Sequence, residues 1–128
     1  MPRLVIADDS DLMRRSVRNF LAGDSRFRVV GEAVNYAEAL KLVQELRPDV
    51  LLADLRMPGA ESWAEPIRNI VKACGCPVIA TSFSIDDEIQ HLAQEVGVSR
   101  LLDKTKLFDT LIPAIQSVLA SEEQTRSR

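Results

Sequence analysis

Short apolar runs alternate along the chain with longer stretches in which apolar residues recur at helical spacing. The runs are rich in Val, Ile and Leu and cover residues 4–7, 27–30, 50–53, 78–81 and 98–102. Such runs, without clean polar alternation, are typical of parallel strands that are covered on both faces. Because each run is followed by a helical pattern, the sequence predicts an α/β fold, a doubly wound five-stranded parallel sheet with helices on both faces.

The helical stretches each carry one apolar stripe. The clearest stripes are Met13, Val17, Phe20 and Leu21; Trp63, Ile67, Ile70, Val71 and Cys74; Ile85, Ile89, Leu92, Ala93 and Val96; and Phe108, Leu111, Ile112, Ile115 and Leu119. Asn35 with Glu38, and Ser62 with Glu65, have the spacing of capping boxes and mark helix starts. Pro113 lies inside the last stripe, where it predicts a kink or a late helix start.

Length and composition indicate one soluble domain. The chain has 128 residues, of which 46% are hydrophobic and 27% charged, and this size is close to that of a common single domain. Residues 121–128 are polar and without periodicity, so we expect a domain over 1–120 followed by a polar tail or the start of a linker. No apolar run approaches the roughly 20 residues of a membrane span, and no signal-peptide pattern is present. A cytoplasmic location is therefore expected.

Charge and cysteine content exclude two further classes. Sixteen basic and nineteen acidic side chains give a net charge of −3, which argues against a nucleic-acid-binding surface, because such domains are usually basic. Cys74 and Cys76 have neither a second pair nor a flanking His, so they do not make a zinc site. We expect two reduced, half-buried thiols.

Polar side chains gather where the predicted strands end. They are Asp8, Asp9, Asp54, Thr81, Ser82, Asp103 and Lys104. The carboxyl ends of parallel strands share one edge of the sheet, so three carboxylates, a hydroxyl and an ammonium are expected to converge there. Helix capping accounts for one acid per junction, but not for two consecutive acids or for a Lys at the end of an apolar run.

The chemistry of this set points to phosphoryl transfer. Carboxylates without His or Cys suit Mg²⁺, because like charges repel unless a divalent cation lies between them. Lys104 adds a cation for a second anion, and Thr81 or Ser82 adds a hydroxyl donor. Together these groups predict phosphoryl transfer to a carboxylate, in which the protein mainly positions and neutralises charge.

Four segments of the chain form a recognisable set: Asp8-Asp9, DLRMPG at 54–59, PVIATS at 77–82 and LLDK at 101–104. Together they resemble the receiver domain of two-component response regulators. The likeness extends over residues 3–120. The NarL/LuxR type is the most similar, through IADDS at 6–10, VGEA at 30–33 and KTKLF at 104–108. The resemblance implies a flavodoxin-like fold with sheet order 2-1-3-4-5.

The resemblance also implies the chemistry of the acidic edge. Asp54 would accept a phosphoryl group from a histidine kinase or phosphotransfer protein, in a Mg²⁺-dependent reaction. The Mg²⁺ ligands would be Asp8, Asp9, Asp54 and the backbone carbonyl of Arg56. The chain would then be a phosphorylatable receiver and not an enzyme that acts on outside substrates.

The switch residues follow from the same likeness. The family places the switch hydroxyl five residues after a Pro, here Pro77, which selects Ser82 and leaves Thr81 to the core. Lys104 would pair with the phosphoryl group. The signal would leave through the face made by the fourth helix, fifth strand and fifth helix, with homodimerisation on phosphorylation as a further expectation. The domain itself is expected to bind neither nucleic acid nor membrane.

Departures from the family pattern leave some points open. Leu101 replaces the usual aromatic switch residue, so we expect a smaller conformational change. Phe83 replaces a small residue after the switch hydroxyl and is either a gate at the mouth of the site or a core residue.

Other conspicuous polar residues are expected at the surface. His91 is expected to be solvated. The arginines at positions 14, 15 and 18 form a solvated face or a docking surface for a kinase.

Three alternatives compete with a phosphorylated receiver. A degenerate receiver would act only as an interaction module, but the acids, hydroxyl and Lys are all present. A Mg²⁺-dependent phosphatase with an Asp nucleophile would need a second Asp two residues after Asp54, where Arg56 stands. A flavodoxin-like electron carrier would need a hydroxyl-rich loop after the first strand, which here is acidic.

Overall fold

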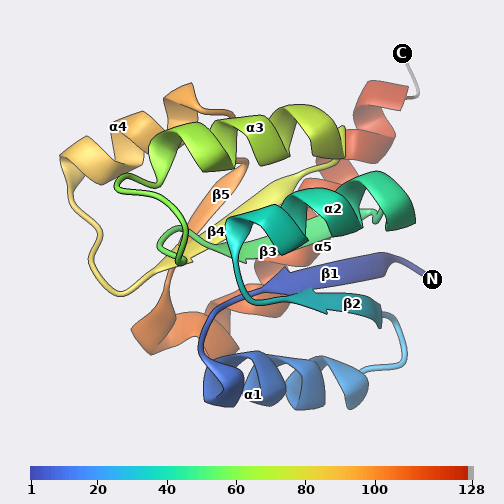
Figure 1. The fold of residues 1–128 in the computed structure, drawn as a ribbon. Coiled ribbons are helices and arrows are strands. Elements are labelled where there is room, and N and C mark those ends of the chain that lie inside the picture. Colours follow the sequence, from blue (N-terminus) through green and yellow to red (C-terminus); the bar gives the residue numbers. More distant parts are fainter. Residues whose placement is uncertain (127–128) are drawn as a thin grey trace.

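The computed structural model describes residues 1–126 and has the predicted α/β architecture (Figure 1). Its elements in chain order are β1 (Arg3–Ala7), α1 (Asp11–Ala22), β2 (Arg28–Ala33), α2 (Tyr36–Leu46), β3 (Val50–Asp54), α3 (Ala64–Cys74), β4 (Val78–Ser82), α4 (Asp87–Glu95), β5 (Arg100–Asp103), a 3₁₀ turn (Lys104–Lys106) and α5 (Leu107–Arg126). All strand pairs are parallel, in the order β2-β1-β3-β4-β5. The predicted fold class and sheet order are confirmed.

Two layers of helices enclose the sheet. One apolar cluster joins α2, α3 and α4 to one face, through residues such as Val43, Ile67 and Ala93. A second cluster joins α1 and α5 to the other face, through Leu21 and Ile115 among others. Figure 1 shows α2 and α3 on one side of the sheet and α1 on the opposite side. With both faces covered, the carboxyl ends of the strands are where side chains can gather to form a site.

The strands differ in burial. The central strands β3 and β4 are buried along their whole length, and β1 is buried after its first residue. The edge strands β2 and β5 are mostly half-buried. Both edge strands still pack against each apolar cluster, through Val30 and Leu101 on one face and Val29 and Leu102 on the other, so they are covered on both faces but less completely than the central strands.

The sequence signals placed one helix start correctly and another wrongly. The Asn35 side chain accepts a hydrogen bond from the Glu38 N–H at 2.8 Å, and the Glu38 carboxylate accepts one from the Val34 N–H at 2.9 Å. Ser62 does not cap its helix: α3 begins at Ala64, and the Ser62 hydroxyl oxygen is 3.5 Å from the Ala64 nitrogen. A second correction concerns α4, which begins at Asp87, so that residue 85 precedes the helix.

The last helix is longer than predicted. It begins at Leu107, directly after the 3₁₀ turn, and Pro113 lies in its interior, so the late start is wrong. The helix also continues through residue 126, across the start of the segment that the sequence predicted to be a polar tail or the start of a linker from residue 121. The part of that prediction that concerns residues 127–128 lies outside the described residues. Within residues 1–126, no helix is long and apolar enough to cross a membrane.

The cysteine prediction is also corrected. Cys74 and Cys76 are half-buried, as expected, but they form a disulfide. Cys74 ends α3, and Gly75 takes a left-handed conformation with φ +61° that turns the chain back. The two Cα atoms are therefore only 5.1 Å apart, within the range that a disulfide spans.

Candidate functional site

The carboxyl ends of four strands bring the predicted site residues to one edge of the sheet. Asp8 and Asp9 follow β1, Asp54 ends β3, Ser82 ends β4, and Lys104 follows β5. One carboxylate oxygen from each of the three Asp residues lies within 4.8 Å of the others. Asp8 and Asp54 are buried, whereas Asp9 is exposed. The cluster is thus open to solvent on the Asp9 side.

Lys104 bridges the two buried carboxylates. Its ammonium nitrogen lies 2.9 Å from Asp8 Oδ2 and 3.0 Å from Asp54 Oδ2. Lys104 is itself buried, as the first residue of the 3₁₀ turn. Asp103 starts that turn: its carboxylate accepts hydrogen bonds from the N–H and the hydroxyl of Thr105. Asp103 therefore acts as a cap and is not in the carboxylate cluster.

Backbone N–H groups orient the remaining carboxylate oxygens. The Ser10 N–H donates to Asp8 Oδ1 at 2.9 Å, and the Arg56 N–H donates to Asp54 Oδ1 at 3.2 Å. The Asp8 carbonyl accepts a hydrogen bond from Arg14 at 2.9 Å, which ties the loop after β1 to α1. Each buried carboxylate is therefore held by one ammonium and one amide before any ligand arrives.

Charge explains what this cluster can bind. Burial raises the pKa of the Asp54 carboxyl, and Lys104 only partly offsets this effect. Burial alone would lower the pKa of Lys104, but its hydrogen bonds to Asp8 and Asp54 raise it instead. With Asp9, the ionised cluster has three negative charges and one positive charge. An all-oxygen donor set with this excess of negative charge fits one divalent cation such as Mg²⁺.

Burial does not separate the two candidate hydroxyls, because Thr81 and Ser82 are both 3% exposed. The Ser82 hydroxyl has partners in the loop after β4. The Ser82 hydroxyl donates to the Ser84 carbonyl at 2.9 Å and accepts from the Ser84 N–H at 3.2 Å. The side chain of Ser82 thus contacts the loop that leads to α4, whereas the Thr81 carbonyl accepts from the Leu55 N–H across the sheet.

Phe83 is a surface residue beside this cluster. Its side chain is 67% exposed, so the interpretation of Phe83 as a core residue is wrong. The ring centroid lies 4.9 Å from the ammonium nitrogen of Lys104, within cation–π distance. An exposed aromatic ring therefore covers the cation that holds Asp8 and Asp54.

Sequence reasoning missed Tyr36, the first residue of α2 and the only Tyr in the chain. Its hydroxyl is buried and forms hydrogen bonds with the backbone of Leu55 and Met57, on either side of Arg56. A signal existed, because the Asn35 cap places residue 36 at a helix start, and a buried Tyr needs a partner for its hydroxyl. The identity of that partner required the fold.

The other singled-out surface residues lie away from the cluster or have local partners. His91 is exposed on α4, as expected. Arg14 and Arg18 both form ion pairs with Glu32 on β2, at 3.1 and 2.9 Å, so they are not simply a solvated face. Arg15 is exposed.

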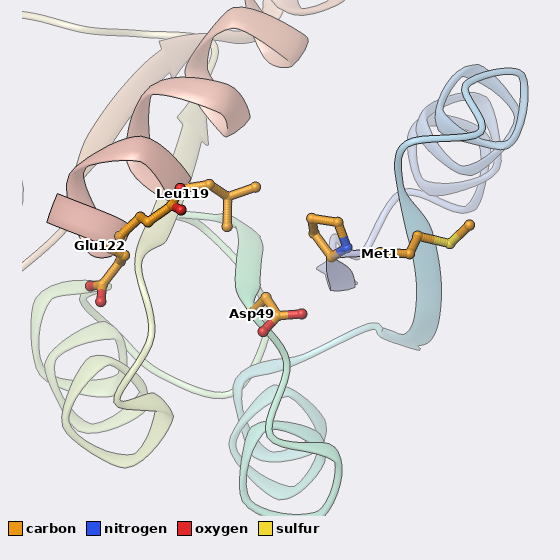
Figure 2. Close-up of a pocket in the computed structure, with 6 residues that line it drawn as sticks. Met1, Asp49, Leu119 and Glu122 are labelled. Atoms are coloured by element: carbon orange, nitrogen blue, oxygen red, sulfur yellow. The ribbon is translucent and has the colours of Figure 1, made fainter. Parts of the chain in front are cut away.

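A pocket lies elsewhere on the molecule. Figure 2 shows it between Met1, Asp49, Leu119 and Glu122, which come from the chain start, the segment before β3 and the end of α5. These residues lie near the amino ends of the strands, opposite the carboxylate cluster. The pocket contains none of the site residues predicted from the sequence.

Known proteins share both the sequence pattern and the fold. LiaR, a transcriptional regulatory protein of Bacillus subtilis (strain 168), is 30% identical over 130 residues, which cover 100% of this chain and 61% of LiaR. The protein-glutamate methylesterase/protein-glutamine glutaminase 2 of Koribacter versatilis (strain Ellin345) is 41% identical over 80 residues, 62% of this chain but only 22% of that enzyme. The chain thus spans about three fifths or less of the length of these two relatives.

Solved structures give the same result. The signal receiver domain of the response regulator NarL from Mycobacterium tuberculosis superposes with a TM-score of 0.83 at 30% identity, covering 93% of this chain and 96% of that one. A LuxR-family two-component response regulator from Aurantimonas sp. SI85-9A1 gives a TM-score of 0.86 at 27% identity, over 94% and 86% of the two chains. Residues 4–116 match the family described as response regulator receiver domain, and the chain belongs to that family.

Proposed function

We propose that this receiver accepts a phosphoryl group on Asp54 from a histidine kinase or phosphotransfer protein. The observation that carries the proposal is the double support of Asp54, whose Oδ2 contacts Lys104 and whose Oδ1 accepts the Arg56 N–H, beside Asp8 and Asp9. A carboxylate oxygen of Asp54 attacks phosphorus, the bond from phosphorus to the donor imidazole breaks, and an aspartyl phosphate forms. The acceptor belongs to the protein itself, so no outside substrate is consumed.

The neighbouring groups supply the charge stabilisation. Asp8, Asp9, Asp54 and the Arg56 carbonyl are the proposed ligands of Mg²⁺, which when bound supplies positive charge to the phosphoryl oxygens. Lys104 already contacts the acceptor carboxylate and is in reach of an anion attached there. These residues position and neutralise the transferred group, which is most of what phosphoryl transfer asks of a protein.

Ser82 connects the site to the output face. Its hydroxyl donates to the Ser84 carbonyl, and a phosphoryl oxygen on Asp54 would compete for that single donor proton. Transfer of this hydrogen bond would release the loop before α4 and shift an equilibrium between two loop arrangements. The signal then leaves through α4, β5 and α5, where homodimerisation is the proposed readout. Leu101, half-buried on β5, offers a smaller side chain than an aromatic ring, so the shift should be modest.

Labelling with a small acyl-phosphate donor tests the proposal. Wild-type protein should incorporate phosphate when Mg²⁺ is present, and chelation or Asp54→Asn should abolish incorporation. Asp103→Asn is the matched control, because Asp103 also lies at a strand end but its carboxylate caps a turn. Labelling that survives in Asp54→Asn would contradict the assignment of the acceptor. An absence of labelling in wild type would instead favour a degenerate receiver that only binds partners.

The proposed receiver unit comprises residues 1–120. The family match ends at residue 116, within α5.

Arg56 weighs against the alternative of an Asp-nucleophile phosphatase, because a side chain with a fixed positive charge cannot act as the second acid. That alternative predicts turnover of an added phosphomonoester, which the labelling experiment can measure in parallel.

A further inference from the structure

One buried hydroxyl holds the loop that follows the proposed acceptor. Tyr36 Oη donates a hydrogen bond to the Leu55 carbonyl at 2.6 Å and accepts one from the Met57 N–H at 3.0 Å. The Tyr36 side chain is only 8% exposed. Leu55 and Met57 are the residues immediately before and after Arg56, so the peptide groups on both sides of Arg56 are fixed from α2.

The Arg56 backbone is held at a third point as well. Its N–H donates to Asp54 Oδ1 at 3.2 Å. Within the part of the chain that the structure describes, the Arg56 carbonyl accepts no hydrogen bond. The loop therefore combines constrained backbone on either side with one carbonyl oxygen that has no protein partner, next to three carboxylates that lie within 4.8 Å of one another.

The helix start that carries Tyr36 is well fixed. The Asn35 cap and the Glu38 carboxylate fix the first turn of α2, and Tyr36 packs in the same apolar cluster as Leu55, Met57 and Val43. A hydroxyl on such a support can restrict the rotation of the Arg56 peptide better than a solvent-exposed loop can.

We propose that Tyr36 is a positioning residue for the metal site, whose hydroxyl orients the Arg56 carbonyl toward the cation and so sets the affinity for Mg²⁺. This inference rests on the proposed function, because it takes the Arg56 carbonyl as a ligand. The proposal gives helix α2 a part in positioning the metal ligands, although the other site residues lie at or just after the carboxyl ends of strands. Tyr36 touches neither the phosphoryl group nor the cation, and it acts through the backbone.

Tyr36→Phe tests the role, because it removes the hydroxyl and keeps the ring. The dissociation constant for Mg²⁺ is measured by calorimetry and by amide chemical shifts, without any phosphodonor. Loss of a supporting hydrogen bond around a metal ligand typically weakens binding 10–100-fold, and we expect a rise of about tenfold here. Val43→Ala is the matched control: Val43 is buried on the same helix, in the same cluster, without a hydrogen bond to the loop.

The outcomes separate the two proposals. A tenfold loss of Mg²⁺ affinity in Tyr36→Phe, with unchanged affinity in Val43→Ala and urea midpoints lowered in both, supports the positioning role. An affinity of Tyr36→Phe within twofold of wild type overturns it, as does an equal loss of affinity in Val43→Ala. If wild-type protein binds no Mg²⁺, the proposed function itself fails, and the role of Tyr36 fails with it.

Discussion

Replacement of Lys104 by Met removes the cation that two buried carboxylates share. The ammonium lies 2.9 Å from Asp8 and 3.0 Å from Asp54, and the side chains of these acids are 6% and 9% exposed. Removal of one partner from a buried ion pair costs about 3 to 5 kcal/mol, because the remaining charge is left uncompensated. Met keeps most of the buried alkyl chain, so little of this loss comes from packing.

The expected loss for Lys104→Met is about 3 kcal/mol, at the lower end of that range. Burial already raises the pKa of the Asp54 carboxyl, and uptake of a proton there limits the cost of unpaired charge. Without the ammonium, which lowers it, the folded-state pKa of Asp54 rises further above its unfolded value. Such a carboxyl destabilises the fold above that pKa, and the penalty is relieved as the pH falls. The gap between variant and wild type should therefore narrow from pH 7 to pH 5.

Urea unfolding with and without Mg²⁺ measures these effects. A divalent cation that binds only the folded state stabilises it, and the gain should be larger in Lys104→Met, where the cation meets no competing ammonium. Lys41→Met is the control, because Lys41 forms an exposed pair with Glu45 at 4.0 Å, for which the expected change is within about 0.5 kcal/mol. A loss below about 1 kcal/mol for Lys104→Met, or a Mg²⁺ effect no larger than in wild type, would refute the reasoning.

Three further outcomes are expected. Phe83→Ala should lower the free energy of unfolding by only about 1 kcal/mol, because the ring is exposed and loses mainly its cation–π contact with Lys104. It should speed both phosphorylation by a small donor and loss of the phosphoryl group; unchanged rates would exclude a gate. Asp24 should titrate with a pKa of about 2, because its side-chain hydrogen bond with Arg26 lowers the pKa. In Arg26→Ala, the Asp24 pKa, measured from the pH dependence of the carboxyl ¹³C chemical shift, should rise toward the ordinary value for Asp. The stability that this contact supplies is lost as the pH falls through the lowered pKa. Gly97→Ala should cost about 2 kcal/mol in urea unfolding, because φ is +98° and a Cβ would lie 2.8 Å from a side-chain carbon of α3; a smaller loss than in Gly23→Ala, where φ is −74°, would contradict this.

Much of the fold was predictable because local patterns and global packing agree. The central strands are short apolar runs, because both faces of a strand between two helix layers are buried and need apolar side chains. Asp8, Asp54 and Lys104 were predictable as neighbours for the same reason, since parallel strands end at a common edge. Helix starts were predicted less well, because a capping sequence alone does not fix where a helix begins. Ser62 has the residue type and spacing of a cap, but α3 begins at Ala64.

The features that the sequence did not predict depend on the three-dimensional arrangement of segments that are distant in sequence or outside regular elements. Nothing local in Phe83 distinguishes a core ring from a surface ring, because the strand ends at Ser82 and alternation no longer fixes its direction. Tyr36 is distant in sequence from Leu55, and its hydroxyl bonds to peptide groups, which have no side-chain signature. A motif records the side chains that touch a ligand. The groups that aim a backbone carbonyl at that ligand can come from any element that packs nearby, and here the element is a helix that contributes none of the motif residues.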